Sequence, residues 1–180
     1  MAEQVIALLR GINVGRAKRV AMADLRALLT DLGYDQPRTL LNSGNAVFGC
    51  RARQSGPAAE RIEAAIADRL GVRCTVITRT ASELAAVVAA DPFAVVASDP
   101  ARYLVGFAAA PPVPEVVRQL HARDFGAERV RIVGREAYLW CAAGIAESEL
   151  TKALGSVIGV ELTTRNWNTV LKLAALAGVG

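Results

Sequence analysis

The sequence predicts an α+β protein that consists of two tandem copies of a βαββαβ unit, each followed by a trailing helix. Short apolar runs with β-branched residues, which are typical of buried strands, alternate with stretches whose apolar residues recur every three or four positions, as on one face of a helix. These elements follow one another in the order β-α-β-β-α-β-α, and the same order repeats in the second half of the chain. This is the order of the ferredoxin-like split βαβ motif, so we expect antiparallel sheets with helices packed on them.

The first subdomain is expected over residues 1–90. Its predicted strands span residues 5–9, 38–41, 46–48 and 74–78, and its predicted helices begin at Met22, Pro57 and near Thr80. Gly33 and Gly71 stand where a left-handed C-cap ends the first two helices. Thr80 and Glu83 have the spacing of a capping box, which starts the third helix. The turn Asn42-Ser43-Gly44-Asn45 joins two brief strands, because Asn and Gly tolerate positive φ.

A linker is expected over residues 91–101, and the second subdomain over residues 102–180. Asp91-Pro92 and Asp99-Pro100 flank the linker, and a residue before proline is pushed out of helical geometry. The predicted strands of the second subdomain span residues 103–107, 129–133, 137–141 and 160–163, and its predicted helices begin at Pro114, Glu147 and Asn166.

Single residues of the two copies can be aligned, which favours a duplication. Ala46 aligns with Ala137 and Cys50 with Cys141 at the same offset, and Thr78-Arg79 aligns with Thr164-Arg165. The largest length difference follows the first strand of each copy. The first copy has the basic segment 10–21 there, and the second copy has a shorter turn rich in Ala and Pro.

Composition excludes several classes of protein. Apolar residues make up 53% of the chain and charged residues 21%, which is too apolar for a disordered chain. The longest apolar stretch contains three prolines and is shorter than the roughly 20 residues that cross a bilayer, so no membrane span is expected. The first residues lack the basic and apolar regions of a secretion signal, so we expect a cytoplasmic protein.

Cysteine and histidine counts exclude most metal and disulfide chemistry. The three cysteines lie far apart, which argues against a disulfide framework and a thiolate metal site. His121 is the only histidine, so a zinc site built from several imidazoles cannot form, and we expect no metal or cofactor. His121 lies near the end of the fourth predicted helix, where we expect it at the surface. The net charge of +4 favours anionic partners only weakly.

The basic segment after the first strand is one candidate binding site. It contains Arg10, Asn13, Arg16, Lys18 and Arg19 and leads into a helix N-terminus, which attracts anions. In a ferredoxin-like sheet this loop and the hairpin turn that holds Asn45 emerge at the same end. The loop suits phosphate, carboxylate or polar nucleoside groups, and the alternative is a solvated loop whose arginines only aid solubility. Asp24 follows in the first turn of the helix, where a carboxylate also stabilises the helix dipole.

The second candidate site is the stretch Arg165-Asn166-Trp167-Asn168-Thr169. Asn166 or Asn168 can cap the last helix, with Trp167 as its first buried apolar residue. Alternatively, the Arg and the two amides can contact a base or sugar while the indole stacks on it. The two interpretations are compatible, and both stay open at this point.

Three segments together resemble the bacterial family catalogued as domain of unknown function 1697. They are Leu8-Leu9-Arg10-Gly11-Ile12-Asn13-Val14-Gly15, Asn42-Ser43-Gly44-Asn45 before Val47-Phe48, and Thr164-Arg165-Asn166-Trp167-Asn168-Thr169-Val170 before Lys172-Leu173. The likeness spans essentially the whole chain. Members usually carry a second Gly after Gly15, where this chain has Arg16, so its loop is bulkier and more positive.

The resemblance implies a pair of related α+β subdomains and a nucleoside 2'-deoxyribosyltransferase activity, which exchanges bases on deoxyribonucleosides. Such a reaction passes through an oxocarbenium-like centre and needs polar groups rather than a metal or redox cofactor. No motif of paired carboxylates is present, and Asp24 is the one candidate for catalysis, with Glu161 as the other acid near the family segments. The candidate substrate-binding residues are Arg10, Asn13, Asn45, Arg165, Asn166, Trp167 and Asn168.

We therefore expect a protein that binds a small nucleoside between its two copies, with base exchange as the leading activity. For these residues to form one site, the copies must share a single cleft. The alternative is a non-enzymatic nucleic-acid or nucleotide binding protein, which the aromatic content of 5% disfavours because few rings are present to stack on bases. A third class is an interaction or structural protein whose motifs serve only turns and caps. A homodimer is compatible with the scattered apolar residues.

Overall fold

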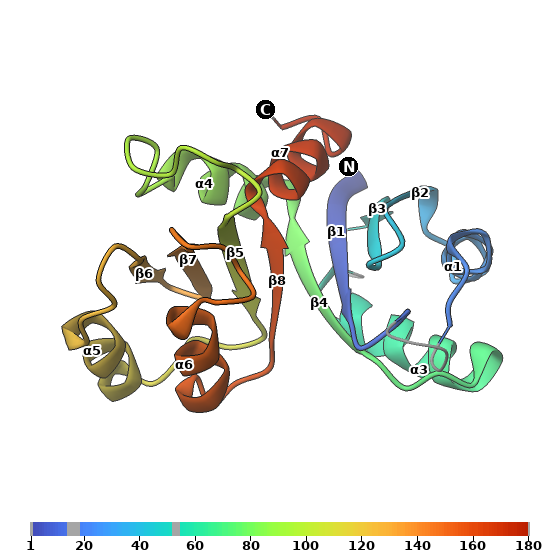
Figure 1. The fold of residues 1–180 in the computed structure, drawn as a ribbon. Helices are drawn as coiled ribbons and strands as arrows, with labels where there is room; N and C mark the ends of the chain where they lie inside the picture. The colour runs from blue at the N-terminus through green and yellow to red at the C-terminus, as the bar shows by residue number, and fades with distance from the viewer. Residues whose placement is uncertain (1, 14–18, 52–54, 180) are drawn as a thin grey trace. The chain divides into compact units, whose positions relative to one another are not determined.

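Two compact units make up the chain, of which the computed structural model describes residues 2–13, 19–51 and 55–179. Unit 1 contains residues 1–86 and 173–180, and unit 2 contains residues 87–172. Each unit has one four-stranded antiparallel sheet (Figure 1). The predicted α+β class with two ferredoxin-like copies is confirmed.

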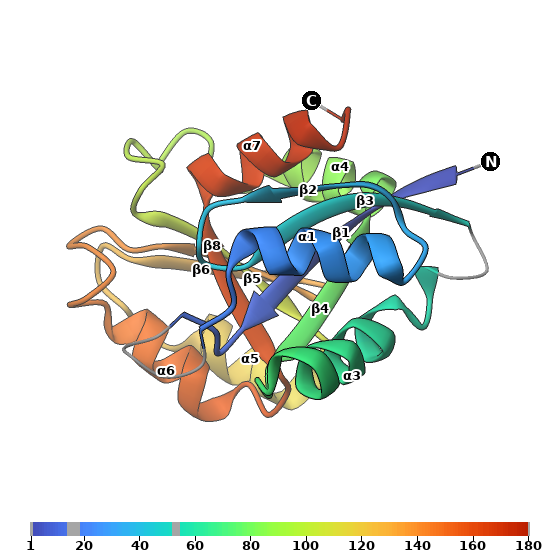
Figure 2. The ribbon, with the colours of Figure 1, turned by 90° about the vertical axis from the view of Figure 1, so that its right-hand side faces the viewer.

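The sheet of unit 1 has the strand order β2-β3-β1-β4. In chain order the elements are β1 (Ala2–Arg10), α1 (Met22–Asp31), β2 (Asp35–Leu40), β3 (Asn45–Arg51), α3 (Ala58–Leu70) and β4 (Thr75–Thr80). Helices α1 and α3 cover the same face of this sheet (Figure 2). All three strand pairings are antiparallel, so β1 and β2 run in the same direction with β3 between them.

Side chains that alternate along β1 build the core of unit 1. Val5, Ala7 and Leu9 are buried and face the helices, because successive residues of a strand point to opposite faces. Leu25 from α1 and Ile62 from α3 pack against them. Full burial of one such side chain contributes roughly 1.5 to 3 kcal/mol, so this shared core holds both helices on the sheet.

Unit 2 repeats the arrangement with the strand order β6-β7-β5-β8. Its elements are β5 (Tyr103–Ala108), α5 (Pro114–Ala122), β6 (Arg129–Val133), β7 (Glu136–Trp140), α6 (Glu149–Val157) and β8 (Leu162–Asn166). Two further helices cross the division between the units, namely α4 (Ala81–Ala90) and α7 (Trp167–Leu176). Leu104, Leu139 and Leu154 belong to the apolar core that α5 and α6 form with the second sheet.

Strand register supports the predicted alignment of the two copies. In unit 1, Ile6 pairs with Val47 on one side and with Arg79 on the other. In unit 2, Val105 pairs with Tyr138 on one side and with Arg165 on the other. The aligned residues Arg79 and Arg165 therefore occupy the same register position in the last strand of each sheet.

Local signals for helix ends agree with the structure. Gly33, which follows the C-cap of α1, has φ of 83°, and Gly71 caps α3 with φ of 65°. At the start of α4, the Thr80 backbone N–H donates to a carboxylate oxygen of Glu83 (2.8 Å), and the Glu83 N–H donates to the Thr80 hydroxyl oxygen (3.2 Å). The predicted capping box is thus confirmed.

The last strand differs from its predicted bounds. β8 begins at Leu162 and ends at Asn166, whereas the sequence predicts residues 160–163. Leu104 on β5 pairs with Asn166, so cross-strand hydrogen bonding extends the strand toward α7. Arg165 consequently lies inside a strand and not in the loop where the sequence places it.

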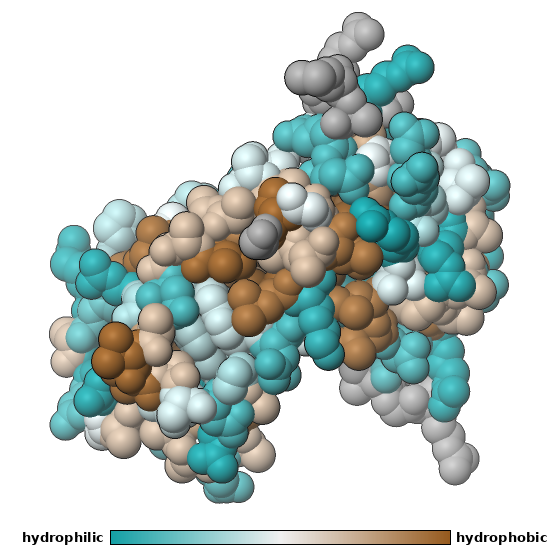
Figure 3. Space-filling model, turned by 90° about the horizontal axis from the view of Figure 1, so that it is seen from above, coloured by the Kyte–Doolittle hydropathy of each residue, from teal (hydrophilic) through white to brown (hydrophobic). Residues whose placement is uncertain are grey.

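No helix in the described part of the chain is long and apolar enough to span a membrane. Large apolar side chains that are exposed lie in several elements and loops, and Val95 in the segment between β5 and α4 is fully exposed. On the face seen from above, apolar and polar side chains are interspersed (Figure 3).

Candidate functional site

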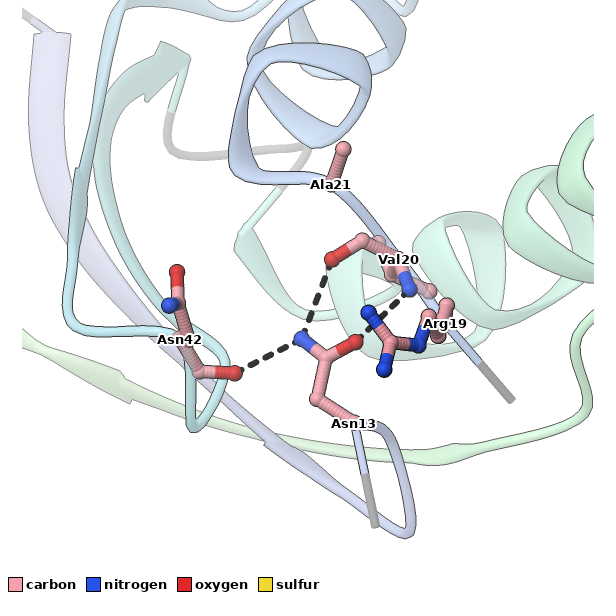
Figure 4. Close-up of a pocket in the computed structure, with 5 residues that line it drawn as sticks. All are labelled: Asn13, Arg19, Val20, Ala21 and Asn42. Carbon is pink, nitrogen blue, oxygen red and sulfur yellow. Dashed lines mark hydrogen bonds between the residues drawn. The ribbon is translucent and has the colours of Figure 1, made fainter. Parts of the chain in front are cut away.

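Asn13 ties the β1–α1 connection to the β2–β3 turn in unit 1. Its side-chain Nδ2 donates hydrogen bonds to the backbone oxygens of Val20 (3.0 Å) and Asn42 (2.7 Å), and its Oδ1 accepts one from the Val20 N–H (2.9 Å) (Figure 4). Asn13 has φ of 54°, a left-handed conformation that Asn tolerates better than most residues. The side chain that sequence analysis places against a ligand therefore clamps two loops, and the predicted meeting of these loops at one end of the sheet is confirmed.

Close packing fixes the hairpin turn against β1. The Leu9 N–H donates to the Gly44 carbonyl oxygen at 2.8 Å. Gly44 has φ of 86°, and a Cβ added there would lie 2.7 Å from both Leu9 Cβ and Ile12 Cδ1. Only glycine fits this turn, because any larger residue would meet both the positive φ and these contacts.

Asn45 lies at the base of the same turn and is fully buried. Its Nδ2 donates to the Leu40 carbonyl oxygen (2.7 Å) and to the Ser43 hydroxyl oxygen (3.0 Å). Among the candidate residues of unit 1, Asn45 thus acts inside the turn, where it satisfies buried polar groups.

A pocket opens beside the Asn13 clamp. Its volume is about 360 Å³, which is within the range of small-molecule sites. The described residues that line it are Asn13, Arg19, Val20, Ala21 and Asn42 (Figure 4).

The start of α1 gives this pocket an electropositive wall. Ala21 is the N-cap residue and has no side-chain oxygen for the first backbone N–H groups of the helix. The exposed guanidinium of Arg19 adds a full positive charge at the same place. A helix N-terminus and an arginine together favour an anionic or strongly polar ligand.

Arg10 and Asp24 flank this region without lining the pocket as far as its described residues show. Arg10 is the last residue of β1 and is exposed, and Asp24 is exposed in the first turn of α1. The predicted loop residues Val14, Gly15, Arg16 and Lys18 lie outside the described residues.

Residues of the second candidate stretch belong to β8 and α7. Asn166 caps α7, because its Oδ1 accepts hydrogen bonds from the Thr169 N–H (3.0 Å) and hydroxyl (2.8 Å). Trp167 is buried, with 8% of its surface exposed, and Asn168 is exposed in the first turn of the helix. The capping interpretation of Asn166, with a buried Trp167 after it, is confirmed.

An aromatic cluster in unit 2 holds Trp167 in place. The rings of Tyr103 and Trp167 stack with their centres 4.8 Å apart, and the ring centres of Phe93 and Tyr103 are 6.0 Å apart. The Tyr103 hydroxyl donates to a carboxylate oxygen of Asp91 at 2.9 Å. Burial, and then the bond to Asp91, raise the pKa of Tyr103, so this phenol stays neutral.

The aligned arginines Arg79 and Arg165 are both buried, with exposures of 2% and 8%. In each, Nη1 donates to the carbonyl oxygen of the preceding threonine at 2.8 Å, and in Arg165 it also donates to the Thr163 hydroxyl oxygen at 2.8 Å. Burial lowers the pKa of Arg165 to about 10, so its side chain remains charged at neutral pH. Both arginines are therefore buried residues of the last strand of each sheet. The alignment of the two copies in the sequence already pairs Arg79 with Arg165.

Sequence reasoning pointed to the helix N-terminus at this end of the sheet but did not select Asn42, Val20 or Ala21 as pocket residues. The available signal was the Asn42-Ser43-Gly44-Asn45 turn, in which the first Asn lies at the pocket and the last is buried. The second candidate stretch belongs to unit 2 and the pocket to unit 1. A single cleft shared by the two copies therefore stays a prediction.

No group of three or more His, Cys, Asp or Glu side chains suited to a metal ion occurs among residues 2–13, 19–51 and 55–179. Cys50 and Cys141 are buried, and burial raises the pKa of both thiols, which disfavours the reactive thiolate. The described residues thus offer hydrogen-bonding and cationic chemistry at the pocket.

Comparison with known proteins gives a family and a fold. The model of the family DUF1697, described as a protein of unknown function, matches residues 2–138. The conserved bacterial protein SP0830 from Streptococcus pneumoniae is similar in structure, with a TM-score of 0.80 and 23% sequence identity over 98% of this chain and 99% of that chain. No curated protein matches the sequence.

Proposed function

This chain belongs to the DUF1697 family, and we propose that it binds a nucleoside or nucleotide in the pocket beside α1. The observation that carries this proposal is the pocket of about 360 Å³ that Arg19, the uncapped start of α1 and the Asn13 clamp line together. Arg19 and the backbone N–H groups in the first turn of α1 would bind a phosphate or sugar hydroxyls. The exposed Asn42 side chain would contact the base or sugar.

The Asn13 clamp supports this proposal by making the pocket rigid before a ligand arrives. Its hydrogen bonds join the loop before α1 to the hairpin turn, so two walls of the pocket are fixed to each other. A preorganised site loses less conformational entropy on binding than two loops that must first be ordered. Asn13 thus positions the site in this proposal, and Arg19 contacts the ligand.

Titration of the 15N-labelled protein with deoxyadenosine and with its 5'-monophosphate tests the proposal. We expect the backbone amide signals of Val20 and Ala21 to shift with ligand concentration, because both residues line the pocket. Arg19→Gln should weaken binding of the monophosphate about tenfold, in the range of one hydrogen bond to a charged group. Arg73→Gln is the matched control, since Arg73 is also an exposed arginine of unit 1 but does not line the pocket. Unchanged amide signals with both ligands would contradict the proposal.

Base exchange on deoxyribonucleosides is a second candidate function, and Asp24 is the observation that favours it. Its exposed carboxylate lies in the first turn of α1, three positions after the pocket residue Ala21. A retaining exchange would use a carboxylate to attack the sugar C1' while the departing base takes up a proton. The acceptor base would then displace the carboxylate and give up its own proton, so that the protons balance over the exchange. None of the described pocket residues is acidic, and residues 14–18 include no Asp or Glu. Of the two acids near the family segments, Asp24 belongs to unit 1 with the pocket and Glu161 to unit 2, so the exchange proposed here assigns the carboxylate to Asp24.

Incubation of the purified protein with deoxyadenosine and a free pyrimidine base tests the exchange. Formation of the pyrimidine deoxyribonucleoside, detected by chromatography, is the expected product, and Asp24→Asn should abolish it while ligand-induced amide shifts remain. Binding without exchange would leave a nucleotide-binding protein and remove the enzyme. Steep loss of binding to single-stranded oligonucleotides with rising salt would instead support the nucleic-acid alternative, because such contacts release counterions.

A further inference from the structure

His121 connects α5 to the outer strand of the second sheet. Its Nε2 accepts a hydrogen bond from the backbone N–H of Ile132 at 3.1 Å. Ile132 lies on β6, which is an edge strand in the order β6-β7-β5-β8 and has only β7 as a neighbour within that sheet. Backbone groups of an edge strand that point away from the sheet have no ladder partner. The imidazole therefore occupies the place that a further strand would take.

This hydrogen bond exists only while the ring is neutral. A neutral imidazole that carries its proton on Nδ1 presents Nε2 as an acceptor, whereas both nitrogens of a protonated ring are donors. A protonated His121 would direct an N–H toward the Ile132 N–H, so the bond would be lost and two donors would face each other. We propose that His121 acts as a pH-dependent latch. The neutral ring bonds the Ile132 N–H and covers the edge of β6, and the protonated ring leaves that edge exposed.

Desolvation of the ring and one nearby positive charge keep this latch closed at neutral pH. His121 is exposed at the surface, as predicted, but partial desolvation of its ring, and then the positive charge of Arg131 on β6, lower its pKa below the ordinary value of 6.5. The charged groups of the neighbouring helices pair among themselves, Arg118 with Glu115 on α5 and Lys152 with Glu149 on α6. The neutral form thus predominates at pH 7. Because the folded pKa is depressed, the stability from this bond is present above pH 6.5 and is lost as the pH falls below it.

Release of the latch would be local. The neighbouring Leu120 is buried with 2% exposure in the core of unit 2, and Val117 packs against the same core. These apolar contacts do not titrate, so α5 would stay docked while the outer side of β6 became accessible to solvent. An unguarded strand edge can pair with another chain. The latch would thus couple proton concentration to the exposure of one particular edge.

Amide hydrogen exchange and NMR titration of the intact protein test the proposal. Since the chain has one histidine, its ring proton signals report a single midpoint directly. We expect this midpoint below pH 6.5. We also expect the protection factor of the Ile132 amide, corrected for the intrinsic pH dependence of exchange, to fall roughly three- to tenfold with the same midpoint, as for the loss of one hydrogen bond. The Ala108 amide, which donates to the Arg135 carbonyl oxygen at 2.8 Å, is the internal control and should not follow this midpoint.

Three variants separate the latch from a general effect of acid. His121→Gln retains an acceptor oxygen that does not titrate, so Ile132 protection should become independent of pH. His121→Leu removes the acceptor, so protection should be low at every pH. Arg131→Gln removes the nearby positive charge and should raise the midpoint of the histidine. Ile132 protection that does not follow the histidine titration, or that still falls with acid in His121→Gln, would overturn the proposal.

Discussion

Removal of the Asn13 side chain provides the most direct test of how the candidate site is held together. Asn13→Ala deletes the three hydrogen bonds to the backbone of Val20 and Asn42. Each bond contributes about 0.5 to 1.5 kcal/mol, and their partly exposed setting favours the lower part of that range, so together they contribute about 2 kcal/mol. An alanine at φ of 54° also destabilises the folded state by about 1 kcal/mol, because its Cβ disfavours the left-handed conformation. The expected loss in free energy of unfolding is therefore about 3 kcal/mol.

Two companion variants divide this loss into its parts. Asn13→Gly accepts the positive φ, so it should lose only the hydrogen bonds, about 2 kcal/mol. Asn168→Ala is the matched control, because Asn168 is an exposed amide on a helix and should change stability by less than about 0.5 kcal/mol.

Urea unfolding followed by circular dichroism, together with exchange of the Val20 amide, measures the effect of Asn13→Ala. Tryptophan fluorescence is unsuitable, because Trp140 and Trp167 both lie in unit 2 and Asn13 lies in unit 1. We expect a lower urea midpoint and faster Val20 exchange, since its N–H loses its acceptor. A change below 0.5 kcal/mol in both Asn13 variants, with Val20 protection retained, would refute the clamp.

Three further substitutions test other contacts. Gly44→Ala should lower the free energy of unfolding in urea by about 3 kcal/mol, because the added Cβ would lie 2.7 Å from atoms of Leu9 and Ile12. Gly33→Ala is the control and should cost only about 1 kcal/mol, since Gly33 has a similar φ but no atom within 4 Å of an added Cβ. A larger loss for Gly33→Ala than for Gly44→Ala would contradict the packing argument. Asn166→Ala should cost about 1 kcal/mol in thermal unfolding by removing the cap of α7, and Asn166→Asp should restore most of it, so equal losses would count against the cap. Because the pKa of Tyr103 is raised in the folded protein, the unfolded phenol ionises first, so the contribution of Tyr103 to stability is present below pH 10 and is lost as the pH rises further. Tyr103→Phe should reduce this loss of stability at alkaline pH. An unchanged dependence of stability on pH in Tyr103→Phe would argue against a role of Tyr103.

The candidate site shows how far reasoning from sequence extends. The basic segment, its helix start and the turn at residues 42–45 mark the correct end of the first sheet, because strand direction alone brings those loops together. Roles within the site do not follow from residue type. The Asn13 amide bonds backbone groups, the Asn45 amide bonds a backbone oxygen and the Ser43 hydroxyl, and Asn42, which sequence reasoning did not select, lines the pocket. The side-chain amide of an Asn in a turn can hydrogen-bond a ligand or the backbone, and only the positions of the neighbouring groups in the fold show which of the two it bonds.

The sequence by itself determined the fold class, the duplication and the local helix ends. Gly33 and Gly71, the Thr80–Glu83 capping box and the order of helices and strands along the chain can be predicted from the sequence, because each signal acts over a few residues or through a fixed period. Tertiary structure decided which polar groups meet across long stretches of chain. The Asn13 clamp, the burial of Arg165 and the contact of His121 with Ile132 depend on elements brought together by the fold, since hydrogen bonding and desolvation act over a few ångströms in space, whatever the separation along the sequence.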